Sequence, residues 1–122
     1  MITPLHQIKA EFFKTLSHPI RIGVLELLSE REYSVGELLR QLDVEASNLS
    51  QQLAVLRRAG LVTTRKEGST VYYSLISAQI ADLMAVARSI LTSVLSEQAD
   101  LLTTLRSDAR TARRNHVRRG AR

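Results

Sequence analysis

Apolar side chains recur every three or four positions through most of this chain, which is the spacing of helices that bury one face. The helices that this spacing predicts cover residues 5–16, 19–29, 34–42 and 46–58, and a last helix begins near Ser77 and runs past Leu105. Ser34 and Glu37 form a capping-box pattern at the start of the third, and Gly60 follows the fourth, where a left-handed residue would close it. The segment 30–33 is expected to form a polar turn.

The period changes after Gly60. Residues 61–65 and 70–75 are rich in β-branched and aromatic side chains, which favour strands. Residues 66–69, which include Gly68, separate these two runs and predict a β-hairpin. Helix, short helix, turn, helix and hairpin in this order predict a mainly α fold with a β-hairpin wing, a winged helix-turn-helix.

The predicted helix 46–58 combines a buried face with a polar one. Leu49, Leu53 and Leu56 are expected to point inward, and no acidic residue lies between Ala46 and Gly60 to repel phosphates. Hydroxyl and amide side chains on its other faces can bond to base edges or phosphates, although such a face is also typical of a solvated helix. The candidate DNA contacts are Ser47, Asn48, Ser50, Gln51 and Gln52 on this helix, Arg57 at its end, and Arg65, Lys66 and Ser69 on the hairpin.

The predicted last helix repeats apolar residues at alternating steps of four and three, interrupted only by Gln98, which is close to the period of a coiled coil. A helix of about 29 residues is roughly 44 Å long, more than a chain of this size can cover by itself. We therefore expect a homodimer formed through the first and last helices, rather than a last helix buried within one chain. The candidate dimer-interface residues are Leu5, Ile8, Phe12, Ile80, Met84, Ala87, Leu91 and Val94.

The net charge of +5 belongs to the end of the chain. Residues 106–122 contain seven arginines and a single acid, Asp108, whereas residues 1–105 carry ten basic side chains against eleven acidic ones. We expect a winged-helix dimer domain over residues 1–105 and an arginine-rich tail, frayed or disordered, over residues 106–122. The alternatives for the tail are phosphate contacts without sequence preference, binding to a membrane or an acidic partner, and solubility alone.

Several function classes lack their usual residues. The absence of cysteine excludes disulfides and thiolate metal sites, and the five glycines form no phosphate loop, so we expect neither an enzyme nor a cofactor. No signal peptide is visible and no apolar run approaches the roughly 18 residues that cross a bilayer, so we expect a cytoplasmic protein without a membrane partner. His18 is expected to cap or pack rather than bind metal, and His116 is expected to be solvated. His6 could pair with an acid such as Glu11, but such a pair would hold a metal only loosely.

Five segments in this order resemble the ArsR/SmtB family of bacterial winged-helix repressors. They are FKTLSHPIR (13–21), SVGEL (34–38), SNLSQQL (47–53), VLRRAGLV (55–62) and GSTVYYSL (68–75). Together the resemblance extends over about residues 8–95. It implies a homodimer formed by the first and last helices, with helix 46–58 reading DNA.

The positions at which many of these repressors bind metal depart from the family pattern. Leu39, Arg40 and Gln41 stand in place of a Cys-x-Cys pair, and the positions of a second metal site are Ser77, Gln79, Ile90 and Ser93. These side chains cannot hold zinc or nickel tightly, so no metal is expected. Gln52 stands where many members carry histidine, which keeps hydrogen bonding but alters base preference.

The sequence thus predicts a sequence-specific DNA-binding repressor that binds a pseudo-palindromic operator in double-stranded DNA as a homodimer. The alternatives are a winged-helix protein-interaction module, a non-specific architectural DNA binder and, third, a metal-responsive switch. An unidentified effector ligand is a further expected partner. It would enter near Phe12, Phe13, Met84 and Ile90, although such a cluster is also typical of plain core.

Overall fold

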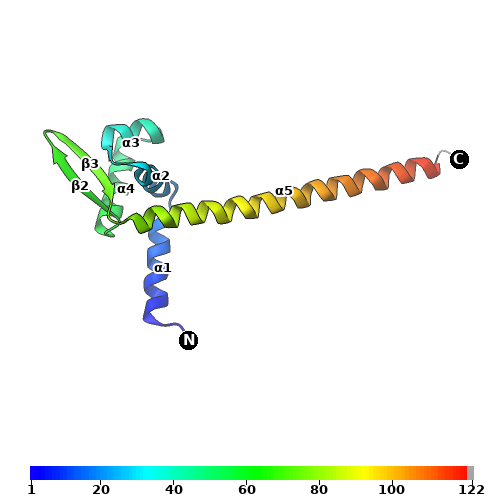
Figure 1. Ribbon diagram of the computed structural model, residues 1–122, viewed down its shortest axis with the longest axis horizontal. Helices are drawn as coiled ribbons and strands as arrows, with labels where there is room; N and C mark the ends of the chain where they lie inside the picture. The colour runs from blue at the N-terminus through cyan, green and yellow to red at the C-terminus, as the bar shows by residue number, and fades with distance from the viewer. Residues whose placement is uncertain (121–122) are drawn as a thin grey trace. The chain divides into compact units, whose positions relative to one another are not determined.

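A computed structural model describes residues 1–120, except for the side chains of residue 112 and residues 115–120. Its contacts divide the chain into two compact units, residues 1–85 and the residues from 86 onward. The first unit contains the helix-turn-helix, the hairpin and the first turns of the last helix (Figure 1). The division falls within the last helix, whereas the sequence placed a boundary between residues 105 and 106.

The first four helices lie close to the predicted ranges. They are α1 (Pro4–Leu16), α2 (Pro19–Glu30), α3 (Val35–Leu42) and α4 (Ala46–Arg58). At the start of α1, Thr3 and His6 form a capping box in which the Thr3 N–H donates to His6 Nδ1 over 3.0 Å. At the start of α2, His18 Nδ1 accepts from the Ile20 N–H over 3.1 Å, which confirms the capping role expected of His18.

Left-handed residues close the two helices of the helix-turn-helix. Asp43, with φ 51°, ends α3, and Gly60, with φ 75°, follows α4. Glycine adopts this conformation without the steric cost of a Cβ atom, so Gly60 allows the chain to leave α4 sharply and enter the hairpin.

The hairpin pairs in the predicted place. Strand β2 (Val62–Glu67) lies antiparallel to β3 (Thr70–Leu75), and the Glu67–Thr70 pair leaves a two-residue turn. Gly68 occupies the first turn position with φ 61°, and glycine there is typical of a type II′ hairpin, whose twist matches that of the strands. The hairpin extends past the neighbouring helices as a wing (Figure 1).

The sheet has a third strand that the sequence analysis missed. Strand β1 (Tyr33–Ser34) pairs with β3, giving the order β1-β3-β2. The prediction of a polar turn over residues 30–33 is therefore wrong at Tyr33, which lies opposite Tyr73. The Tyr33 side chain is buried in the core, and its backbone pairs with the edge of β3.

The core of the first unit is almost wholly aliphatic. Its buried residues are Leu16, Val24, Leu25, Leu28, Tyr33, Leu38, Leu49, Leu53, Leu56, Leu61, Val62, Ile80 and Met84. The structure corrects the assignment of Ile80 and Met84 to a dimer interface, because each is only 7% exposed within its own chain. Helical spacing identifies an apolar face but does not tell which partner covers it.

The last helix, α5 (Ala78–Gly120), is longer than predicted. It continues through the segment after residue 105 that was expected to be frayed or disordered; residues 121–122 of that segment lie outside the described residues. Arginine and alanine both favour helix, so the loss of large apolar residues need not end it. The stretch Ala78–Thr111 is long and apolar enough to cross a membrane by length and composition alone. Small polar residues interrupt the apolar ones, so the stretch contains no long uninterrupted apolar run although its average hydropathy is high.

Candidate nucleic-acid interface

Helix α4 presents a polar surface from a firmly packed base. Leu49, Leu53 and Leu56 are buried in the core, as predicted. On the outer surface, Ser47, Ser50 and Gln51 are exposed, and Asn48 is half-buried. The buried leucines fix the rotation of α4 about its axis, so the hydroxyl and amide groups of the outer face are offered to solvent together.

Gln52 differs from the other candidate contacts because it points inward. It is 8% exposed, and its Oε1 accepts a hydrogen bond from Arg21 Nε over 2.8 Å. Its Nε2 donates to Asn48 Oδ1 over 3.0 Å. Both ends of the amide are engaged, so this geometry does not support a direct base contact by Gln52 and gives it a positioning role instead.

Arg21 connects α4 to the end of α1. Besides bonding to Gln52, its Nη1 donates to the backbone carbonyl of Thr15 over 3.0 Å. Asn48, Gln52, Arg21 and Thr15 therefore form a continuous series of hydrogen bonds between three helices. Sequence spacing contained a signal for this arrangement: Gln52 lies three residues after Leu49 and four before Leu56, on the buried side.

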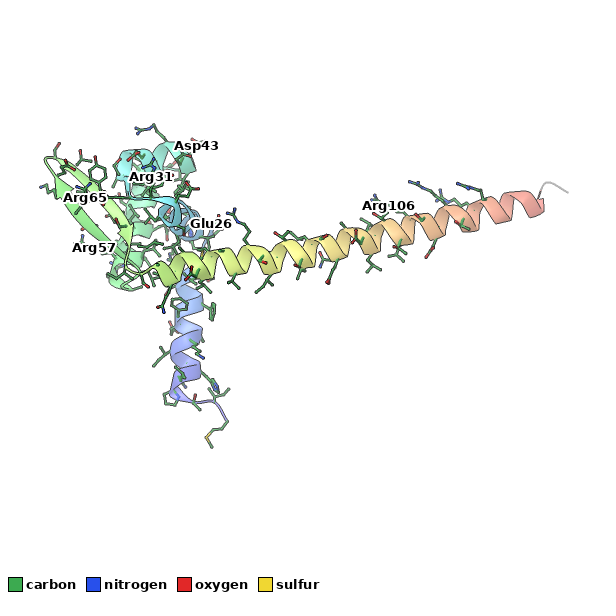
Figure 2. The ribbon with its side chains drawn as sticks, viewed as in Figure 1. Glu26, Arg31, Asp43, Arg57, Arg65 and Arg106 are labelled. Carbon is green, nitrogen blue, oxygen red and sulfur yellow. The ribbon has the colours of Figure 1, made fainter. Side chains whose placement is uncertain are left out.

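The remaining phosphate candidates are exposed. Arg57 lies in the last turn of α4, and Lys66 and Ser69 lie at the tip of the hairpin. Arg57 and Arg65 are labelled on the α4 and hairpin part of the first unit in Figure 2. The charge of Arg57 is also placed to stabilise the negative end of the α4 dipole.

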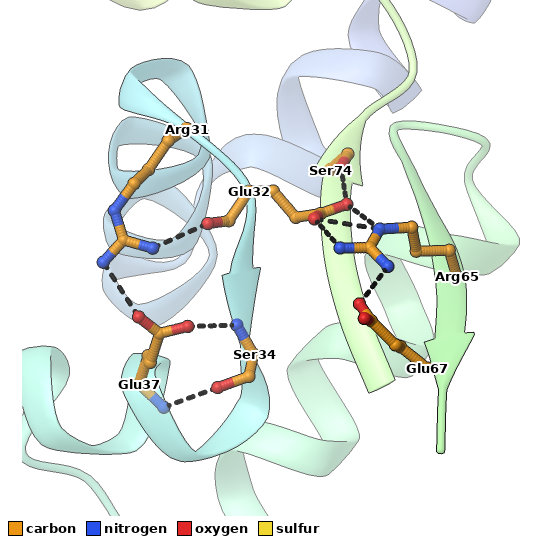
Figure 3. Close-up of polar contacts among 7 residues, drawn as sticks. All are labelled: Arg31, Glu32, Ser34, Glu37, Arg65, Glu67 and Ser74. Carbon is orange, nitrogen blue, oxygen red and sulfur yellow. Dashed lines mark hydrogen bonds and ion pairs between the residues drawn. The ribbon is translucent and has the colours of Figure 1, made fainter. Parts of the chain in front are cut away.

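Arg65 is held by carboxylates instead of projecting freely (Figure 3). Its Nη2 lies 2.6 Å from Glu32 Oε1, and its Nη1 lies 2.8 Å from Glu67 Oε2. The guanidinium carbon also stands 4.5 Å from the centre of the Tyr72 ring. The bond from Arg65 lowers the pKa of Glu32 below its usual value, and Ser74 adds a second hydrogen bond to the same carboxylate. A phosphate that contacts Arg65 must therefore compete with these carboxylates for its guanidinium group.

A second polar cluster fixes the start of α3 (Figure 3). The predicted capping box is confirmed: the Glu37 N–H donates to Ser34 Oγ over 3.2 Å, and the Ser34 N–H donates to Glu37 Oε1 over 3.0 Å. Arg31 Nη2 adds a bond of 2.9 Å to Glu37, and its guanidinium carbon lies 3.7 Å from the centre of the Tyr33 ring. The hydrogen bond from the Ser34 backbone lowers the pKa of Glu37 most, and the hydrogen bond from the Arg31 side chain lowers it further. The sequence analysis missed all three arginine–glutamate pairs, which join Arg31 to Glu37 and Arg65 to Glu32 and Glu67.

The candidate dimer residues, apart from Ile80 and Met84, are not buried in the core of their own chain. Leu5, Ile8, Leu91 and Val94 are exposed, whereas Phe12 and Ala87 are half-buried. Phe12 also meets Phe13 edge to face, with ring centres 5.4 Å apart. Among the residues that the structure describes, no group of three or more His, Asp or Glu side chains could hold a metal ion.

Comparisons with known sequences identify the family pattern. The model for bacterial regulatory proteins of the arsR family matches residues 18–64, from the start of α2 into β2. The HTH-type transcriptional regulator Rv0081 of Mycobacterium tuberculosis (strain H37Rv) is 56% identical over 105 residues, which cover 85% of this chain and 92% of that one. A biofilm growth-associated repressor of Xylella fastidiosa (strain Temecula1) is 45% identical over 75 residues, covering 62% of this chain and 66% of the repressor.

Solved structures agree with this match. The crystal structure of Rv0081 superposes with a TM-score of 0.75 and covers 80% of this chain and 99% of the other at 56% identity. The solution structure of the homodimeric winged helix-turn-helix domain of Mb0332 from Mycobacterium bovis superposes with a TM-score of 0.69 at 27% identity, covering 76% and 86% of the two chains. The predicted winged helix-turn-helix fold is confirmed.

Proposed function

The chain belongs to the ArsR family of bacterial transcriptional regulators, which are DNA-binding proteins and not enzymes, and we propose that it is a sequence-specific repressor that binds a pseudo-palindromic operator as a homodimer. The observation that carries the proposal is the outer face of α4, where exposed hydroxyl and amide groups stand on a base fixed by buried leucines and Gln52. The Xylella fastidiosa relative is a repressor, which supports repression as the outcome of binding. We propose that it acts in the cytoplasm, where a bacterial regulator of this kind meets the chromosome.

Helix α4 would enter the major groove with its exposed face against the base edges. Gln51 can pair with adenine through both ends of its amide, and Ser47 and Ser50 can bond to bases or phosphates. Asn48 is half-buried and already accepts a bond from Gln52, so its contact would come from the free amide N–H groups. In this proposal Gln52 orients Asn48 and does not itself touch DNA.

The phosphate contacts surround this face. Arg57, Lys66 and Ser69 are exposed and can meet the backbone without rearrangement. Arg65 would join them by exchanging Glu67, the more exposed of its two carboxylate partners, for a phosphate. Since each neutralised phosphate releases counterions, these contacts make binding depend on salt without supplying sequence preference.

We assign the dimer interface to apolar side chains of α1 and α5 that are exposed or half-buried within their own chain. These residues are Leu5, Ile8, Phe12, Ala87, Leu91 and Val94. Exposed leucine, isoleucine and valine side chains left in water would be costly, and a second copy can cover them with side chains of the same kind. Two-fold symmetry then sets two α4 helices in successive major grooves, about 34 Å apart.

The proposal is tested by fluorescence anisotropy with duplex DNA from the region upstream of the protein's own gene, against a scrambled duplex. We expect a preference of roughly a thousandfold at physiological salt. Gln51→Ala should lower affinity for the operator by about 1–3 kcal/mol and affinity for the scrambled duplex hardly at all. Gln41→Ala removes another exposed amide, from α3, and is the matched control.

Equal, steeply salt-dependent binding to both duplexes would overturn the proposal in favour of an architectural or protein-binding role. The dimer is tested separately by sedimentation, with Leu91→Glu expected to give a folded monomer. Association of the unchanged protein with lipid vesicles, and no dimer in solution, would instead assign the apolar stretch of α5 to a membrane.

A further inference from the structure

The last part of α5 carries its positive charge on one side. The described arginines of this segment are Arg106, Arg110, Arg113 and Arg114, which we call the arginine face. At about 100° per residue, all four fall within an arc of about 100° around the helix. Asp108, the only acid after Arg106, falls on the opposite side. Figure 2 labels Arg106 on α5.

No described carboxylate neutralises the arginine face. In the part of the chain that the structure describes, none of its four guanidinium groups forms an ion pair with a carboxylate, in contrast to Arg31 and Arg65. Residues 1–105 have one more acidic than basic side chain. The winged helix therefore lacks the general positive charge that draws a protein to DNA, and the arginine face holds it instead.

The same helix separates the arginine face from its apolar stripe. Leu91, Val94, Leu101 and Leu105 follow the coiled-coil period, and all are exposed within the chain. Their stripe is centred roughly 130° around the helix from the arginine face. In heptad terms the arginines occupy the outer positions b, c and f, so pairing of two α5 stripes would leave every member of the arginine face in solvent.

We propose that the arginine face is a second DNA-binding surface, which holds the phosphates of duplex DNA without reading their sequence. Arginine suits this partner because its planar fork bonds to two phosphate oxygens at once. A membrane fits less well, since Val117 is the only large apolar residue in the segment 106–120 and an interfacial helix needs a broad apolar face to enter lipid. The inference goes beyond the proposed function, because it requires no operator and no base contact.

The test uses the full-length protein and a long duplex of random sequence. One variant replaces the four arginines of the arginine face by glutamine, which keeps helix propensity, and the matched control replaces them by lysine, which keeps the charge. Anisotropy between about 50 and 200 mM salt gives the slope of log affinity against log salt, and each lost phosphate contact should reduce it by about 0.9, or about 3.6 per protomer for the glutamine variant. The lysine variant should retain most of the slope, and circular dichroism checks that both keep their helix.

An unchanged slope in the glutamine variant would overturn the inference. Arginine-dependent binding to vesicles of phosphatidylcholine and phosphatidylserine, with an unchanged DNA slope, would overturn it in favour of a membrane. This test can be separated from the test of the proposed function, because loss of the arginine face should weaken binding to operator and scrambled DNA equally. Loss of Gln51 should instead change their ratio.

Discussion

The hydrogen bond between Arg21 and Gln52 couples the fold to the orientation of the proposed reading helix. We consider Arg21→Met, which keeps the aliphatic stem and removes the guanidinium. Gln52 Oε1 then loses its donor inside a residue that is only 8% exposed, so water cannot readily replace it. The Thr15 carbonyl also loses a donor, but Thr15 is half-buried and can be hydrated.

The expected magnitude follows from this difference in burial. A buried acceptor left without a partner costs about 1–3 kcal/mol, so Arg21→Met should lower the free energy of unfolding by that amount. Gln52→Met alone should cost about 1 kcal/mol, because the partly exposed Arg21 can turn to solvent. The double variant replaces both partners by apolar side chains and should cost less than the sum, giving a coupling energy of about 1–2 kcal/mol.

The four proteins of this cycle are compared by urea denaturation at one protomer concentration, because dimerisation makes apparent stability depend on concentration. Arg106→Met, which removes an exposed arginine from the middle of α5, is the control and should change stability by less than about 0.5 kcal/mol. If the two single variants add within about 0.3 kcal/mol, the bond does not contribute as the geometry indicates. Anisotropy with operator DNA then asks whether Arg21→Met also weakens binding.

Three further changes test other parts of the structure. The lowered pKa of Glu37 means that its contribution is complete above the usual value of 4.5 and is lost as the pH falls through the lower folded value. The urea midpoint should therefore fall in acid, and Glu37→Gln should flatten that fall; an equally steep profile would contradict the assignment. Gly68→Ala should lower stability by about 1–2 kcal/mol through its positive φ alone, since nothing lies within 4 Å of the added Cβ. An unchanged melting temperature would mean that the turn adopts another conformation. Ile80→Ala should lower the stability of the protomer by about 2–4 kcal/mol, which urea denaturation measures, whereas Leu91→Ala should weaken only the dimer, which sedimentation measures. If the two variants changed stability and dimerisation equally, Ile80 and Leu91 would belong to the same interface.

Much of the local structure could be predicted because its causes lie close together in the chain. The capping residues Ser34 and His18 bond to neighbours two or three positions away. The bounds of α4 agree with the prediction for the same reason, because the spacing of its leucines and the glycine beyond it are local signals. The turn at Gly68 likewise depends only on the conformational freedom of glycine.

The contacts that the sequence did not indicate share a different cause, which is a partner distant in sequence. Tyr33 was assigned to a turn because a two-residue strand is too short to show an alternating pattern of apolar residues. Its partner, Tyr73, lies 40 residues away on strand β3 of the hairpin. Gln52 was assigned to DNA because its chemistry suits a base edge, whereas Arg21 in α2 engages it. Arg65 was assigned to DNA phosphates, and its pairing with Glu32 from the segment between α2 and β1 was not predicted.

By itself, the sequence determined the order of helices and hairpin, the polar character of the outer face of α4, and the separation of positive charge from the body. These follow from helix and strand periods, from capping chemistry and from composition, none of which needs a tertiary contact. Only the tertiary structure decided which polar side chains on that helix remain free, which arginines are already neutralised, and which apolar residues of α5 belong to the core. Each of these depends on burial and on partners that folding brings together. The chemistry of a side chain limits what it can bind, but the packing of the folded chain decides which groups lie next to it.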